Sequence, residues 1–281
     1  MFSKAIKSIR RQGPLPLLGM LVLVLITGIF IFPFFWIVTG SVKTQLETVS
    51  LPPHWLPEKI TWENYRLLFL QPAWQWLFNS IFIAVMSMIL VCAVSTSAGY
   101  ALAKKRFTGS GVIFSLFVAA MALPKQVVLV PLVRQVNMMG FHNTPWAVIL
   151  PAVGWPFGVF LMKQFSETIP SELLEAAKID GCSELGIFLR IVVHMVKPGI
   201  GALAIFTFIQ AWNDYFLQLI MLIDREKLTL QLGLATMQGE FATNYGVLMA
   251  GATFAAVPII TMFLLFQKSF TQGIALGAVK G

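Results

Sequence analysis

The chain has 281 residues, of which 57% are hydrophobic and 11% are charged, and its formal net charge is +8 at pH 7. A typical soluble domain has about 45–50% apolar and about 25% charged residues, so this composition excludes an ordinary soluble globular protein and indicates a multi-pass membrane protein. The two cysteines, Cys92 in an apolar run and Cys182 in a charged one, are not expected to pair.

Six segments are long and apolar enough to cross about 30 Å of hydrocarbon as helices. The sequence therefore predicts an all-α polytopic membrane protein with a single transmembrane domain over residues 1–281. The six spans are expected near 15–38, 77–103, 111–134, 145–165, 198–222 and 246–267.

Two of these spans contain breaks in their apolar pattern. The third is interrupted by Pro124, Lys125, Pro131 and Arg134. Its apolar part is expected to end near Leu123, with a separate helix from Leu132 to Met139. In the fourth span, Pro151 and Pro156 predict a kink.

The positions of lysine and arginine predict the orientation, because these residues favour the cytoplasmic side of short loops. With the N-terminus inside, thirteen of the twenty fall on the cytoplasmic side, and the other seven are balanced by six acidic residues. This favours an N-in/C-in topology in the bacterial cytoplasmic membrane, with the lipid bilayer and not nucleic acid as a partner. Tryptophans such as Trp36 and Trp76 are expected at the outer interface with lipid.

A charged segment, residues 167–197, lies between apolar runs on the predicted cytoplasmic side. Ser171 is expected to cap a short helix that Gly181 ends, and a second helix is expected to begin at Ser183. The second helix has one apolar face, formed by Ile187, Phe188, Ile191, Val192 and Met195.

The first of these short helices has the features of a docking surface. Glu172 and Glu175, three residues apart, project from one side, and the small Ala176 and Ala177 allow a partner to approach closely. The alternative is a helical hairpin whose charges are simply solvated.

The residues Glu175-Ala176-Ala177 followed by Asp180-Gly181 resemble the EAA loop with which permease subunits of binding-protein-dependent ABC importers bind their ATPase. The likeness to the MalG-type subfamily of carbohydrate importers extends along nearly the whole chain. It is carried by FPFFWIVTGSVKT at 32–44, TWENY at 61–65, NSIFIAV at 79–85, GYALAKKRF at 99–107, WNDYF at 212–216 and GAVKG at 277–281. Cys182 and His194 depart from the usual Ala and the common Pro of that family.

This resemblance implies a type I ABC importer permease fold and a set of partners. These are a second homologous permease subunit, two cytoplasmic ATPase subunits and an extracytoplasmic solute-binding protein. It also implies contact of the tail at 277–281 with the ATPases. The expected ATPase-docking residues are Glu172, Glu175, Ala176, Ala177, Asp180 and Gly181.

Motifs for catalysis are missing from the sequence. There is no GxxxxGK[ST] phosphate-binding loop, no HExxH or CxxC pair and no GxSxG elbow. We therefore predict no catalytic residue, no metal site and no cofactor in this chain, and we expect ATP and Mg²⁺ to be bound by the partner ATPase.

An acidic residue in the fifth predicted span is a candidate for the substrate path, because carboxylates inside a membrane usually face a bundle interior or a watery path. The candidate residues are Gln210, Trp212, Asn213, Asp214 and Tyr215. At helical spacing, Gln210 and Asp214 are expected to share one face. The alternative is that Asn213 and Asp214 only hold neighbouring helices together.

The sequence thus predicts a permease subunit of an importer for a sugar or oligosaccharide that works by alternating access. Aromatic rings with amides and one carboxylate suit a neutral polyol better than an anion. Two alternatives remain: an importer permease for another solute, such as glycerol phosphate or an amino acid, and an ion-coupled secondary transporter, which would carry internal inverted repeats.

Overall fold

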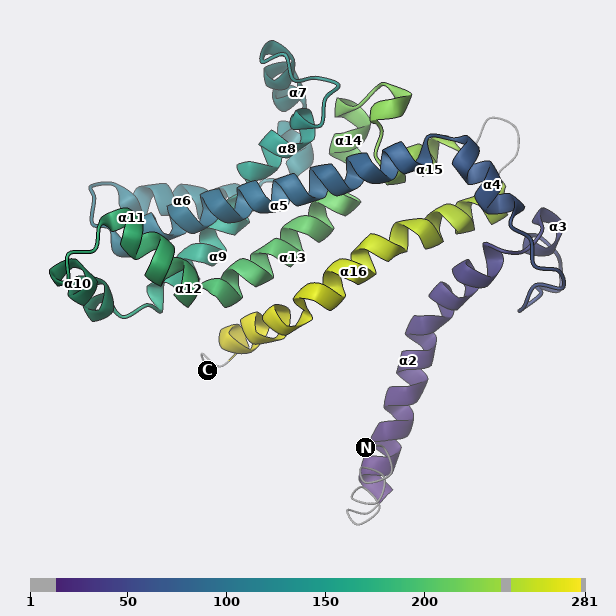
Figure 1. Cartoon of the computed structure of the whole chain (residues 1–281), viewed down its shortest axis with the longest axis horizontal. Helices are drawn as coiled ribbons and strands as arrows, with labels where there is room; N and C mark the ends of the chain where they lie inside the picture. Colours follow the sequence, from purple (N-terminus) through teal and green to yellow (C-terminus); the bar gives the residue numbers. More distant parts are fainter. Residues whose placement is uncertain (1–13, 239–243, 279–281) are drawn as a thin grey trace. The chain divides into compact units, whose positions relative to one another are not determined.

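The computed structural model describes residues 14–238 and 244–278, with side chains for 18–238 and 244–267. The described residues form helices and connecting turns, without a β-strand (Figure 1). The longer helices are α2 (Pro14–Gly40), α5 (Ala73–Lys104), α6 (Ser110–Met121), α7 (Leu129–Met138), α8 (Trp146–Val153), α9 (Pro156–Glu167), α10 (Ser171–Ile179), α13 (Lys197–Asn213) and α16 (Tyr245–Ala278). The shorter ones are α3 (Gln45–Thr48), α4 (Glu63–Leu70), η1 (Lys125–Val128), α11 (Glu184–Ile187), η2 (Phe188–Val192), α12 (Val193–Met195), α14 (Tyr215–Met221), η3 (Arg225–Lys227) and α15 (Leu230–Thr236).

Three helices are long and apolar enough to cross a membrane by themselves, and three bent pairs pass the same test. The single helices contribute Leu18–Gly40, Ala73–Lys104 and Tyr245–Gln267. If each bent pair forms one span, the described residues contain up to six. This agrees with the all-α membrane fold expected from the sequence, whereas the six-span N-in/C-in topology stays a prediction.

The bends in the third and fourth spans occur where proline interrupts the sequence. After α6, Pro124 is extended, and the following helical segment turns by 102°, because a proline disfavours helix in the residue before it and lacks an amide proton. Between α8 and α9 the axis bends by 41°, with Pro156 at the first turn of α9. A separate helix after Leu123 is therefore confirmed, although α7 spans Leu129–Met138 and not Leu132 to Met139, and the kink in the fourth span is confirmed as well.

The fifth span differs from the continuous helix that we expected over residues 198–222. Helix α13 ends at Asn213, and Asp214 has a non-helical backbone conformation, with φ −75° and ψ 80°. Its carboxylate accepts a hydrogen bond from the Leu217 amide and so caps α14. A second bend of 75° separates the helices before Val196 from α13.

The described residues pack as two compact units, residues 14–71 with 237–238 and 244–254, and residues 72–236 with 255–278. In the first unit, the Asn64 amide donates to the carbonyl oxygens of Ser41 and Lys43, which fixes α4 to the end of α2. Gly246 lies against the Asn64 side chain, where any Cβ would clash. The single domain expected over the whole chain stays a prediction.

In the second unit, α5 lies against α9 and α13 (Figure 1). Close approach of α5 and α9 depends on small residues. A Cβ on Gly99 would lie 2.6 Å from the Lys163 nitrogen, and a Cβ on Gly158 would lie 2.3 Å from the Ser95 hydroxyl. Ser95, Gly99 and Gly158 thus allow the two helices to pack closely, whereas a Cβ on Gly154 would meet only one backbone oxygen, that of Pro151.

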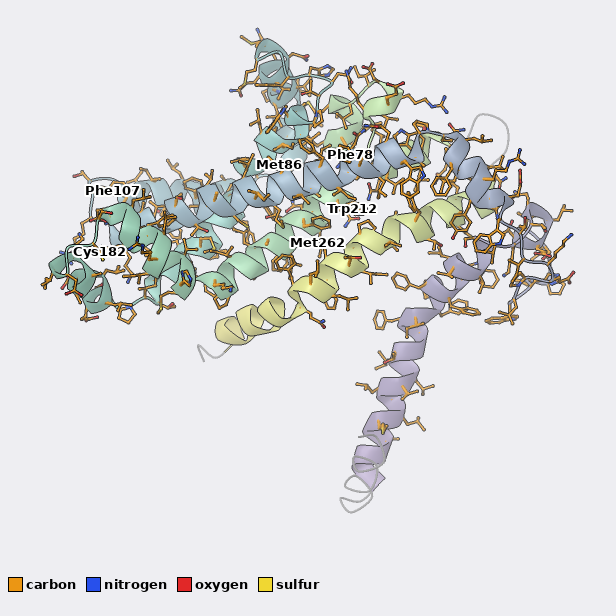
Figure 2. The ribbon with its side chains drawn as sticks, viewed as in Figure 1. Phe78, Met86, Phe107, Cys182, Trp212 and Met262 are labelled. Atoms are coloured by element: carbon orange, nitrogen blue, oxygen red, sulfur yellow. The ribbon has the colours of Figure 1, made fainter. Side chains whose placement is uncertain are left out.

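Tryptophans near the predicted outer ends of the spans have different environments. Trp76 is fully buried, and its indole N–H donates to the Arg225 carbonyl oxygen at 2.7 Å. The expectation that Trp76 faces lipid is therefore wrong, because the α5 start is covered by the segment around η3. Farther along, Trp212 stacks on Phe208, and Met262 of α16 packs against the same cluster (Figure 2).

Candidate coupling segment and membrane cavity

The first helix of the charged segment, α10, begins one residue earlier than expected, because its cap is Pro170 and not Ser171. Pro170 occupies the cap position with extended φ and ψ, and Ser171 is already helical and forms no capping hydrogen bond. The predicted cap at Ser171 is therefore wrong. The fixed φ of Pro170 sets the direction in which the chain enters the helix, and Glu172 in the first turn favours the positive end of the helix dipole.

The end of α10 is set by Gly181, which has a φ of +81°. The Gly181 amide donates to the Lys178 carbonyl oxygen and the Cys182 amide donates to that of Ala177, the hydrogen-bond pair of a Schellman motif. A residue with a Cβ is strained at this φ. The predicted break at Gly181 is confirmed, with a defined geometry.

The second helix begins as predicted, because the Ser183 hydroxyl accepts a hydrogen bond from the Gly186 amide at 3.1 Å. It then passes through a π-helical turn, Phe188–Val192, before α12. Ile187 and Val192 are buried, whereas Met195 is 49% exposed. Met195 is thus wrongly included in the apolar face, because the wider π-turn shifts the register after Val192.

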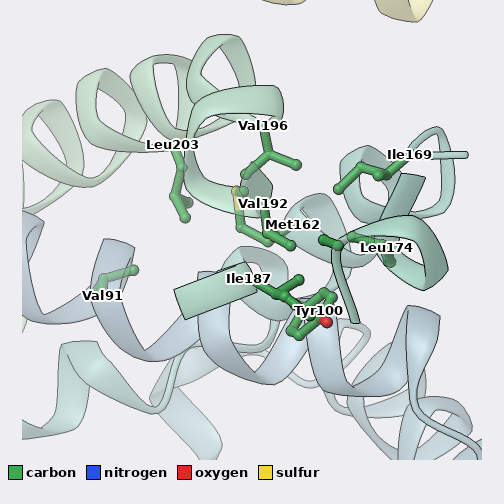
Figure 3. Packing of buried hydrophobic residues seen from close by; sticks show 10 residues of the cluster. Val91, Tyr100, Met162, Ile169, Leu174, Ile187, Val192, Val196 and Leu203 are labelled. Atoms are coloured by element: carbon green, nitrogen blue, oxygen red, sulfur yellow. The ribbon is translucent and has the colours of Figure 1, made fainter. Parts of the chain in front are cut away.

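Buried side chains connect this helical elbow to the membrane helices of the same unit. Leu174 and Ala177 of α10 and Ile187 of α11 belong to one apolar cluster with Tyr100 of α5 and Met162 of α9 (Figure 3). A displacement of the elbow therefore has to move these helices or disrupt their packing, since close-packed interiors transmit strain.

The predicted docking residues divide into exposed and buried groups. Ala177 is 7% exposed and packs inward, so its side chain lies away from the surface. The exposed residues are Glu172, Glu175, Ala176, Asp180 and Gly181. Within the described part of the chain, the carboxylates of Glu172, Glu175 and Asp180 have no ion-pair partner.

A fourth acidic residue, Glu184, has a different role that the sequence did not reveal. It forms ion pairs with Lys105, just after α5, and with Lys178 of α10, the latter at 2.8 Å. The hydrogen bond to Glu184 raises the pKa of the Lys105 amine. Glu184 thus joins both arms of the elbow to the end of α5.

A cavity of about 440 Å³ lies among α5, α6, α8, α13 and the turn around η1. Its wall is largely apolar. The polar side chains in it are Ser87, Lys125, Trp155, Thr207, Gln210 and Asp214. Gln210 and Asp214 therefore share a surface as expected, although a helix break, not a continuous helix, brings them to it.

Asp214 has a basic neighbour in this cavity. The Lys125 Nζ lies 3.9 Å from the Asp214 Oδ2 and 5.3 Å from the centre of the Trp155 ring. The sequence supplied no partner for Asp214, because Lys125 lies in another span. The only feature of the sequence that pointed to Lys125 was that it interrupts an otherwise apolar segment.

The other three candidates for the substrate path do not line the cavity. Trp212 is 1% exposed. Asn213 donates to the Ile209 carbonyl oxygen of its own helix, and Tyr215 is exposed. Residues adjacent in sequence point in different directions around a helix end, so only part of the predicted cluster converges.

Residues 95–275 match the family described as the inner membrane component of binding-protein-dependent transport systems. This stretch covers more than half of the chain and contains the elbow and every residue that lines the cavity except Ser87. The chain belongs to this family, and it is a multi-pass inner-membrane subunit of a transporter. Transport by this family depends on a separate binding protein, as the description states.

Relatives that match over about nine-tenths of both chains support the predicted resemblance to carbohydrate importer permeases. The chain is 35% identical over 257 residues to the arabinooligosaccharides transport system permease protein AraQ of Bacillus subtilis (strain 168), covering 90% of this chain and 92% of that protein. It is 33% identical over 262 residues to the sulfoquinovosyl glycerol transport system permease protein SmoH of Agrobacterium fabrum (strain C58), covering 92% and 91%.

A solved structure shares the fold. It is a bacterial ABC transporter involved in the import of the acidic polysaccharide alginate, with a TM-score of 0.79 and 20% identity. The match covers 90% of this chain and 95% of that chain. The predicted ABC importer permease fold is confirmed. Of the tail, residues 279–281 lie outside the described residues.

Proposed function

We propose that this chain is a permease subunit of an ABC importer that moves a sugar or oligosaccharide into the cell by alternating access. The relatives named for arabinooligosaccharides and sulfoquinovosyl glycerol support a carbohydrate substrate. The Lys125–Asp214 pair supports a neutral one, because its charges offset each other within the cavity.

The observation that carries this proposal is the structure of the elbow between α10 and α11. Its outer face presents carboxylates that have no ion-pair partner among the described residues, and its inner face is packed into the helices of the same unit. A partner that binds the outer face and moves would therefore pull on α5 and α9. This is the arrangement that a lever between an ATPase and a transport path requires.

We further propose the partners that complete the transporter. Two cytoplasmic ATPase subunits, which bind ATP and Mg²⁺, dock on Glu172, Glu175, Ala176, Asp180 and Gly181, and Ala177 supports that surface from beneath. A second, homologous permease forms the other half of the membrane part, and a solute-binding protein delivers the substrate from outside. ATP hydrolysis belongs to the ATPases.

Affinity purification of the tagged chain in mild detergent tests this function directly. Copurification of an ATPase and a second permease, together with ATP-dependent sugar uptake after reconstitution with the binding protein, is the expected result. A solitary protein that transports without ATP would instead support the ion-coupled secondary transporter.

The choice among solutes requires a separate experiment. Binding of neutral oligosaccharides, glycerol phosphate and amino acids to the partner binding protein is measured by calorimetry, since that protein selects the substrate first. Retention of an amino acid or of glycerol phosphate alone would replace the sugar assignment while leaving the importer intact.

A further inference from the structure

The cavity around Asp214 is lined by polar groups that form no hydrogen bond with the described residues. Ser87 and Thr207 are 0% and 2% exposed, line the cavity, and their hydroxyls have no hydrogen-bond partner among the described residues. Buried hydroxyls are nearly always hydrogen-bonded, to protein or to a bound molecule. Two such groups on facing helices, α5 and α13, therefore indicate a ligand or water between them.

The charged pair at the cavity defines which ligands fit. Lys125 and Asp214 are the charged residues in its lining, and they lie within 3.9 Å of each other. An anion bound at the Lys125 ammonium would also lie close to the Asp214 carboxylate, which repels it. A cation bound at the carboxylate would likewise be repelled by the ammonium. A neutral molecule with many hydroxyls avoids both costs, since a carboxylate accepts and an ammonium donates hydrogen bonds.

One aromatic side chain, Trp155, also lines the cavity. The Trp155 ring lies beside Lys125 and lines the same cavity. A large flat ring offers apolar contact to the C–H face of a sugar, while hydroxyls at the sugar's edge reach the polar groups. The volume, about 440 Å³, lies within the range of about 300–1,000 Å³ that small-molecule sites occupy.

We propose that this cavity is a binding site for a neutral sugar unit during its passage, held by Lys125, Asp214, Ser87, Thr207 and Gln210 around Trp155. This inference rests on the proposed function and adds to it a defined station within this chain. It assigns Lys125 and Trp155, which come from other spans than Asp214, to the same substrate contact.

Cysteine protection tests the site in the complete transporter. Cys92 and Cys182 are replaced by Ala and Ser, and the reporter Ala152→Cys is placed in the cavity wall on α8. Labelling by a small methanethiosulfonate reagent is then followed with maltotriose, arabinotriose, trigalacturonic acid or glutamine present. An exposed reporter outside the cavity, Thr108→Cys, controls for effects on the reagent.

We expect the neutral trisaccharides to slow labelling of Ala152→Cys in a concentration-dependent way, and to leave Thr108→Cys unchanged. The double variant Lys125→Met/Asp214→Asn should weaken protection about tenfold or more, since hydrogen bonds to two charged groups are lost. Removing the exposed Glu63–Arg66 pair by Glu63→Gln/Arg66→Met should have no effect.

Three results would overturn the inference: no protection by either neutral sugar, equal protection by trigalacturonic acid or glutamine, or unchanged protection in the double variant. Uptake assays separate this failure from failure of the proposed function. If the wild-type complex still imports sugar with ATP while protection is absent, the site assignment falls and the importer stands. If ATP-dependent uptake and ATPase copurification are both absent, the proposed function falls as well.

Discussion

Gly99 of α5 faces the backbone of Lys163 in α9 so closely that a methyl group on Gly99 would lie 2.6 Å from the Lys163 nitrogen. The neighbouring Met162 carbonyl carbon would lie 2.7 Å from the same methyl. Since both groups belong to backbone, neither can move aside without shifting a helix. Helices α5 and α9 both contribute residues to the elbow's apolar cluster and to the lining of the cavity.

Gly99→Ala is therefore expected to destabilise the protein by about 1–3 kcal/mol, through overpacking of two helices. Gly111→Ala in α6 is the matched control, because a Cβ there meets no atom within 4 Å. Thermal unfolding in detergent, followed by fluorescence-detected size exclusion, measures the difference. Equal melting temperatures for the two variants would contradict the close contact.

The docking role of the elbow predicts uncoupling without loss of the protein. Glu175→Ala/Gly181→Ala removes an exposed carboxylate and forces a Cβ into a φ of +81°, at a cost of about 1–2 kcal/mol. We expect normal amounts of the subunit in the membrane, with less ATPase copurified and ATP-driven uptake largely lost.

Gly140→Ala is the control for the effect of backbone strain without a change in the elbow. Gly140 has a φ of +75° and open space around it, but it lies outside the elbow. Normal uptake by the well-expressed double variant would argue against the docking surface. Equal loss in Gly140→Ala would assign the effect to backbone strain.

Glu184→Gln should loosen the elbow, because Glu184 pairs with both Lys105 and Lys178. The effect on global stability should be small, since solvent screens these exposed pairs. Hydrogen exchange should become faster around residues 180–185, and ATP-driven uptake should fall. Unchanged exchange in this segment would show that apolar packing alone fixes the elbow.

The pH dependence of this contact follows from Lys105. Its pKa is raised above 10.5 by the hydrogen bond to Glu184. Hydrogen bonds from Lys105 and Lys178 lower the pKa of Glu184 from 4.5 to about 2. The stabilisation is therefore fully present between about 4.5 and 10.5, and it is lost as the pH rises through the raised value of Lys105 or falls through the lowered value of Glu184. Exchange rates in the wild-type elbow should show no loosening near neutral pH beyond the intrinsic pH dependence of exchange.

Asn143 is expected to be a structural anchor for the loop before α8. Its side-chain oxygen accepts hydrogen bonds from the amides of Ile223 and Asp224, and its φ is +57°. Asn143→Ala should cost about 1–3 kcal/mol, from two lost hydrogen bonds and the strained φ. Asn143→Gly removes the bonds but relieves the strain, so its melting temperature should lie between those of Asn143→Ala and the wild type.

The predicted topology can be tested with the native cysteines. Cys182 is exposed in the elbow and Cys92 is partly buried in α5. A membrane-impermeant maleimide should leave Cys182 unlabelled in intact cells and label it in inside-out vesicles. The Cys182→Ser variant controls for residual labelling of Cys92. Labelling of Cys182 in intact cells would reverse the N-in orientation.

The sequence by itself determined the class of the protein and much of its local structure. Long apolar runs require helices in a bilayer, because backbone groups there must bond within the segment. Gly181, Ser183 and Pro156 act on the chain next to them, so the elbow's break, the second helix start and the kink followed from local residues alone.

Tertiary structure decided which residues meet. Lys125 approaches Asp214 only because the chain bends after α6 and again at Asp214, and such bends bring different spans together in ways that spacing along one helix cannot show. The burial of Trp76 and Ala177 and the exposure of Met195 likewise depend on neighbours distant in sequence and on a π-turn. Local propensity sets where helices begin and end, whereas packing between them determines which side chains form a site.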